Sequence, residues 1–156
     1  MWDIVLAMRL RQGLDPLFGL AVDDTHNYYK HTIGQSNPGR GWVMVKAQAL
    51  NAENIIASLE KGNFYSTTGV ILDDIQINDR TLTIHIRGET DRAYRTQFIG
   101  TPKQFDTSSK PVLNSQGEPA HITQVYSNEI GQVFAETTDN PAVFYFTGTG
   151  FDVSNC

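Results

Sequence analysis

Apolar side chains in the first sixty residues follow two spacings, which predict alternating helices and strands. The helical spacing begins at Trp2, ends before Gly13, and returns after Asn51. Between the helices lies Leu17–Val22, a continuous apolar run typical of a strand buried on both faces. The predicted order is a helix over 2–12, a strand over 17–22, a loop over 27–41, a strand over 42–45 and a helix over 52–61. We therefore expect this part to begin an α/β fold.

From residue 64 onward, apolar and polar side chains alternate with the period of a strand. Two alternating segments flank Asn78-Asp79 and predict a β-hairpin over about 70–87. Further strands are expected at 95–99, 122–126, 132–136 and 143–147, with a long irregular excursion at 100–119. The last strand is apolar on both faces, which predicts a central position in its sheet. Several short strands separated by turns indicate a β-sandwich-like domain over 64–156, following a first part over 1–63.

Charge and composition exclude several classes of function. The chain of 156 residues has a formal net charge of −5 and its 12 Lys and Arg residues form no basic run, so no nucleic-acid partner is expected. No stretch approaches the roughly 18 apolar residues of a membrane span, and no signal peptide is predicted. The single cysteine, Cys156, excludes an intramolecular disulfide. The cellular compartment stays open.

Asp24 and His26 are the first candidates for chemistry. Their i, i+2 spacing would place both side chains on one face of an extended backbone, with Thr25 on the other. A carboxylate and an imidazole at the end of a buried strand can together bind a divalent cation. The alternative is an Asp that caps a turn beside a solvated His. A catalytic metal also needs at least three protein ligands, and the pair supplies two.

Three blocks of sequence resemble a known family. Residues 19–27 (GLAVDDTHN) resemble the last metal-binding motif of the polymerase and histidinol phosphatase (PHP) family, in its phosphoesterase-like members. The similarity continues, in the same order, through 39–45 (GRGWVMV) and 59–70 (LEKGNFYSTTGV). Such relatives have a distorted β/α barrel that holds metal ions, followed by a small β-sandwich domain. The resemblance implies that Asp24 and His26 are ligands of divalent metal ions, of the kind of Zn, Mn or Fe.

The same resemblance shows what this chain lacks. The family's opening His-x-His motif and its other Asp, Glu and His ligands have no counterpart here. The expected fold class is accordingly α+β, with a short remnant of a PHP barrel over 1–63 and an all-β sandwich-like domain over 64–156. The chain is expected to be the C-terminal part of a metal-dependent phosphoesterase and to be inactive alone.

Arg40 is the candidate for substrate binding. It lies between Gly39 and Gly41 in the loop that follows the presumed metal motif. A guanidinium group binds phosphate through two parallel hydrogen bonds, and the flanking glycines would permit close approach. A phosphorylated small molecule is the expected substrate of the intact protein. The alternative is an ordinary solvated arginine in a surface loop.

A function of a different class is also open. The β-rich part, considered without a complete metal site, would suit a non-catalytic binding or assembly module that recognises a glycan or a protein. If the rest of a barrel is absent, apolar side chains of the first sixty residues would be exposed to solvent. We therefore expect a homo-oligomer that covers this surface.

Overall fold

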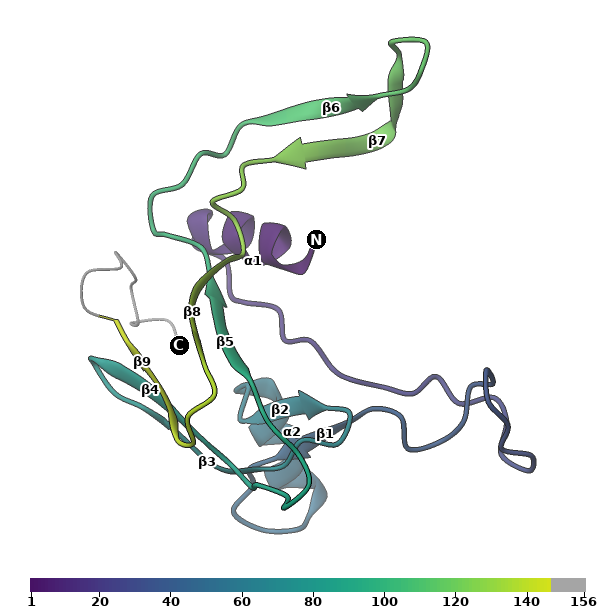
Figure 1. Ribbon diagram of the computed structural model, residues 1–156, viewed down its shortest axis with the longest axis vertical. Helices are drawn as coiled ribbons and strands as arrows, with labels where there is room; N and C mark the ends of the chain where they lie inside the picture. The colour runs from purple at the N-terminus through teal and green to yellow at the C-terminus, as the bar shows by residue number, and fades with distance from the viewer. Residues whose placement is uncertain (147–156) are drawn as a thin grey trace. The chain divides into compact units, whose positions relative to one another are not determined.

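The computed structural model describes residues 1–146 (Figure 1). Within this range, residues 120–123 are described by their backbone and not by their side chains. The elements are, in order, α1 (Trp2–Arg11), β1 (Trp42–Val45), α2 (Ala52–Glu60), β2 (Phe64–Thr67), β3 (Leu72–Ile77), β4 (Thr81–Ile86), β5 (Thr96–Gly100), β6 (Ser109–Leu113), β7 (Pro119–Tyr126), β8 (Gln132–Thr137) and β9 (Ala142–Tyr145). The described strands pair as β1-β2, β3-β4-β9, β5-β8 and β6-β7, and each pairing is antiparallel.

The chain divides into two compact units, which we describe separately. The first, here called the loop–helix unit, is Leu17–Ile71. The second, here called the β-rich unit, combines Met1–Pro16 with the chain from Leu72 onward. Of the described helices, neither has the length and apolar character needed to cross a bilayer.

In the loop–helix unit, α2 connects the two antiparallel strands β1 and β2. The side chain of Asn51 caps the helix by accepting a hydrogen bond from the Asn54 amide at 2.9 Å, as its position in the sequence predicts. Gly62 follows the helix with a φ of +72°, and a Cβ there would lie 2.5 Å from the Phe18 ring. Phe18 in turn meets Phe64 of β2 edge to face, with ring centroids 6.0 Å apart. A glycine at this turn thus allows the chain before the site to pack against β2.

The expected fold class, a PHP barrel remnant over 1–63 followed by an all-β sandwich-like domain over 64–156, is wrong. The described residues form small separate sheets, and no barrel closes among them. A β/α barrel needs parallel strands with a neighbour on each side, whereas β1 pairs only with β2 and is antiparallel to it. The apolar run Leu17–Val22 has no strand partner among the described residues and forms no ladder. The β-rich composition expected of the second part is compatible with the structure.

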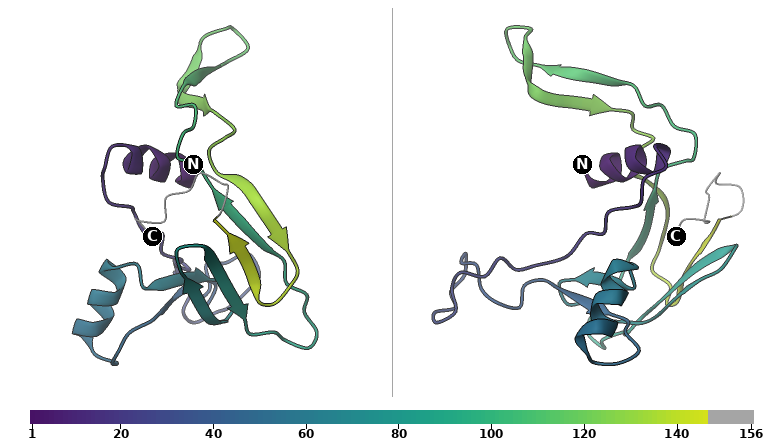
Figure 2. Two further views of the ribbon diagram at one scale, coloured as in Figure 1. Left: turned by 90° about the vertical axis from the view of Figure 1, so that its left-hand side faces the viewer. Right: turned by 180° about the vertical axis from the view of Figure 1, so that it is seen from behind.

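The core of the β-rich unit is an aromatic cluster that joins strands from two sheets. Phe98 of β5 stacks on Phe144 of β9 with ring centroids 5.1 Å apart, and Ala142 beside them is fully buried. β4 lies between β3 and β9, so its backbone is hydrogen-bonded along both edges (Figure 2). Burying these rings supplies the main hydrophobic stabilisation that this unit has.

Most of the predicted elements are confirmed. Both helices, the hairpin β3–β4 and the strands β5, β7, β8 and β9 lie within a few residues of their expected positions. β6 falls in the predicted irregular excursion and was not expected. β9 pairs only with β4 among the described strands, so the prediction of a central position is wrong. Residue 147, the predicted end of that strand, and Cys156 lie outside the described residues. The domain boundary after residue 63 stays a prediction.

Candidate functional site

Asp24 and His26 lie together on an exposed turn of the loop–helix unit. Their side chains are 85% and 70% exposed, and His26 Nδ1 is 3.9 Å from Asp24 Oδ1. The expected extended backbone is wrong at Asp24, which has a φ of +48° in the left-handed region. Asp tolerates this conformation better than most residues, because its short polar side chain bonds locally. The pair therefore shares one turn of the backbone and not one face of a strand.

A hydrogen bond fixes the orientation of the His26 ring. Nδ1 lies 2.6 Å from the backbone carbonyl oxygen of Asp24. A carbonyl oxygen can only accept a hydrogen bond, so Nδ1 carries the hydrogen and donates it. In the neutral ring the remaining lone pair is then on Nε2, the arrangement found in histidines that bind metals. The Asp24 carboxylate accepts no hydrogen bond from any described residue, and its oxygens are available to a cation.

Asp23 holds the turn in place. Its carboxylate accepts hydrogen bonds of 2.6 Å from the Thr25 hydroxyl and from the Gly39 backbone N–H. The bond from the Thr25 hydroxyl, and then the one from Gly39, lower the pKa of Asp23 below its ordinary value of 3.8. Asp23 is therefore an anion that ties the candidate site to the chain sixteen residues later.

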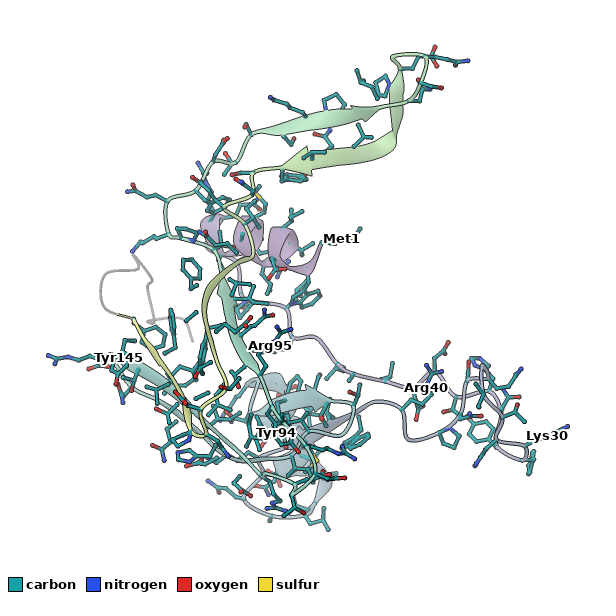
Figure 3. All side chains as sticks on the ribbon, in the orientation of Figure 1. Met1, Lys30, Arg40, Tyr94, Arg95 and Tyr145 are labelled. Atoms are coloured by element: carbon teal, nitrogen blue, oxygen red, sulfur yellow. The ribbon has the colours of Figure 1, made fainter. Side chains whose placement is uncertain are left out.

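The loop over 27–41 is closed by further hydrogen bonds. The backbone N–H groups of His26 and Asn27 both donate to the Ser36 carbonyl at 3.2 Å. Arg40 Nη1 donates to the Gln35 carbonyl at 3.3 Å, and the Arg40 side chain is otherwise exposed. Figure 3 shows Arg40 near the base of this loop and Lys30 at its far end. The predicted metal ligands and the predicted phosphate-binding arginine thus belong to one hydrogen-bonded loop.

Sequence reasoning missed the role of Ser66. Its hydroxyl donates to the Gly19 carbonyl at 2.8 Å and accepts from the Ala21 N–H at 2.9 Å. The apolar run before Asp24 is therefore attached to β2 through a side chain, in place of a backbone ladder. Spacing gave no sign of this contact, because it joins residues more than forty positions apart.

The described residues contain no group of three or more His, Cys, Asp or Glu side chains that could hold a metal ion. The Asp24–His26 pair fits a hard or borderline divalent cation in donor type, but a catalytic metal needs at least three protein ligands and the pair supplies two.

No protein-family model, no curated protein and no solved structure matches the chain.

Proposed function

We propose that this chain contributes Asp24 and His26 to the divalent-metal centre of a PHP-type metal-dependent phosphoesterase. The observation that carries the proposal is the hydrogen bond from His26 Nδ1 to the Asp24 carbonyl, which leaves Nε2 as the free acceptor of the neutral ring. The Asp24 carboxylate on the same turn accepts no hydrogen bond from the described residues. The resemblance of residues 19–27 to the family's last metal motif supports the same assignment.

The bound metal would supply Lewis-acid polarisation of a phosphate ester. Asp24 and His26 would hold Zn, Mn or Fe, since carboxylate and imidazole ligands suit these ions. Arg40 would orient the phosphate group of a small-molecule substrate, because only Nη1 of its guanidinium group is engaged in the loop. The remaining ligands would come from a part of the protein other than the described residues. On this proposal the chain alone does not hydrolyse phosphate esters.

Metal titration of the full chain tests the assignment. We expect Mn²⁺ at low concentration to broaden the NMR signals of residues 24–26 selectively. Asp24→Ala and His26→Ala should each abolish the selective broadening, because each removes one of two ligands. His31→Ala, a loop histidine outside the pair, is the matched control and should leave it intact. Unchanged broadening in Asp24→Ala would reject Asp24 as a metal ligand. This outcome does not depend on any measurement of phosphatase activity.

A second candidate is supported by the β-rich unit. Its strands expose large apolar side chains, more than half exposed at Ile77, Ile99, Leu113 and Val125. The loop–helix unit adds Leu20 and Val22, exposed by 56% and 74%. Uncovered apolar side chains on strands are typical of surfaces that meet a partner. An assembly module that forms a homo-oligomer would cover them.

Light scattering after size exclusion, over a concentration series, tests self-association. We expect a mass above that of one chain, increasing with concentration. Val22→Glu and Val125→Glu each place a charge among the exposed apolar side chains of one unit, and the variant that lowers the mass identifies the unit that self-associates. Asn128→Glu adds the same charge at an exposed polar position and should leave the mass unchanged. A monomer at every concentration would refute assembly through this chain alone.

A further inference from the structure

A hollow of about 510 Å³ lies between the end of β1 and α2, within the loop–helix unit. Its walls are the chain just after β1, which includes Lys46, one face of α2, and Asn63 beyond the helix. The volume is within the range of small-molecule sites in proteins. The hollow shares no lining residue with the Asp24–His26 turn.

The face of α2 that lines the hollow is polar and small. Asn54, Ala57 and Ser58 follow each other at helical spacing, and Lys61 continues this face just beyond the helix end. A helix normally turns large apolar side chains toward the strand it packs on. Here the small side chains of Ala57 and Ser58 leave room at the point where β1 ends.

Three hydrogen bonds hold the walls together. The Ser58 hydroxyl donates to the Lys46 carbonyl at 3.0 Å, and the Lys46 N–H donates to the Asn63 carbonyl at 2.9 Å. The Asn63 N–H donates to the Ser58 carbonyl at 2.9 Å. These three carbonyl oxygens are therefore engaged within the protein. Because they already have donors, they offer little attraction to a cation.

The charge of the lining is positive in a chain of net charge −5. Lys46 and Lys61 line the hollow, and no Asp or Glu is among its described lining residues. Neither lysine forms an ion pair with any other described residue. The side-chain amides of Asn54 and Asn63 add neutral hydrogen-bond donors. One hydrogen of the Asn54 amide is bonded to Asn51 Oδ1 at 2.8 Å, which leaves its second hydrogen for a ligand. Two exposed lysines without an ion-pair partner and two amide donors in one lining are suited to an anion with several acceptor oxygens.

We propose that this hollow is a binding site for a phosphate group, carried by a small molecule. Lys46 and Lys61 supply the charge, and Asn54 and Asn63 donate to the phosphate oxygens. The volume exceeds that of a bare phosphate ion, so there is room for the group that the phosphate is attached to. The site does not depend on the metal centre, and either can fail without the other.

Phosphate titration of the full chain, followed by ¹H–¹⁵N NMR at constant ionic strength, tests this site. We expect saturable shifts at the side-chain amides of Asn54 and Asn63, with a Kd on the order of millimolar. The double variant Lys46→Gln/Lys61→Gln should bind about tenfold more weakly or worse. Lys30→Gln, which removes the same type of charge from the 27–41 loop, should bind as the unchanged chain does.

A second variant keeps the test sharp. Ala57→Glu places a carboxylate inside the hollow without removing a lysine, and it should abolish the shifts while the far-UV circular dichroism is preserved. Shifts that do not saturate, or that survive in the double variant or in Ala57→Glu, would overturn the proposal. Equal weakening in Lys30→Gln would show a general charge effect and would overturn it too. Acetate that binds as tightly as phosphate would reject the phosphate assignment.

Discussion

The loop–helix unit and the β-rich unit are stabilised in different ways. Every apolar side chain that is buried among the described residues belongs to the β-rich unit, with Phe98, Ala142 and Phe144 as the cluster. In the loop–helix unit the buried side chains are Ser58 and Thr67, and both make hydrogen bonds. One region therefore has a small hydrophobic core, while the other buries polar side chains that are hydrogen-bonded to the backbone. Both units expose large apolar side chains, but only the β-rich unit also buries some.

The largest expected effect concerns the aromatic cluster. Phe144→Ala should lower the free energy of unfolding of the β-rich unit by about 3 kcal/mol, since it removes a buried ring and leaves a cavity. Leu20→Ala in the loop–helix unit should cost no more than about 0.5 kcal/mol, because that side chain is already more than half exposed.

Urea unfolding can measure the two units separately, because each contains one of the two tryptophans, Trp2 and Trp42. A Trp42→Phe background reports on the β-rich unit through Trp2, and Trp2→Phe reports on the loop–helix unit through Trp42. Equal losses for Phe144→Ala and Leu20→Ala would mean that the two units do not differ as described.

A smaller effect is expected at the start of α2. Asn51→Ala removes the capping hydrogen bond to the Asn54 N–H and should destabilise the helix by about 1 kcal/mol. Within the loop–helix unit this polar change should therefore exceed the apolar change Leu20→Ala. Amide hydrogen exchange over 52–60 would measure it. Asn51→Asp retains a capping oxygen and is the control that should restore protection.

The smallest effect is local and depends on pH. The pKa of Asp23 is lowered in the folded chain by hydrogen bonds from Thr25 and Gly39, so the stability it contributes is present above pH 3.8 and is lost as pH falls through the lower folded pKa. Below that point the Gly39 amide should exchange faster with solvent, because the link across sixteen residues weakens. Hydrogen exchange between pH 5 and 2, normalised to the intrinsic rate, would show it.

Asp106 provides the matched comparison in the β-rich unit. Its pKa is also lowered, chiefly by the Ser108 backbone N–H and then by the Ser108 hydroxyl. These bonds span two residues, so protonation should loosen only that turn. Protection of the Gly39 amide that does not change with pH would contradict the role of Asp23 as the tie between the site and its loop.

The sequence predicts individual elements better than their partners. Periodicity located the helices at 2–12 and 52–61 because it depends on neighbours a few residues away. The partner of the run 17–22 depends on what lies beside it in space, and periodicity carries no information on that. An apolar run indicates that a segment has to pack against other residues, but it does not say which residues those are. The strand expected of the run was therefore wrong, and so was the barrel that the family resemblance implied.

The candidate site shows the same limit. Residue type and spacing brought Asp24, His26 and Arg40 together, and the structure places all three in one hydrogen-bonded loop. The left-handed backbone of Asp24 was not predictable from an i, i+2 pattern that assumes a strand. The contact of Ser66 with residues 19 and 21 was not predictable either. No local sequence pattern shows that a side chain will bond to a distant backbone where a strand partner was expected.

The hydrogen bond from His26 to its neighbour's carbonyl also decides from which side the ring can be approached. Nδ1 donates to Asp24 O, so in the neutral ring the free lone pair is on Nε2, at the opposite end of the imidazole. A cation that bound there would leave the bond to Asp24 O, and the turn with it, in place. The loop would then need no rearrangement either to receive an ion or to release it.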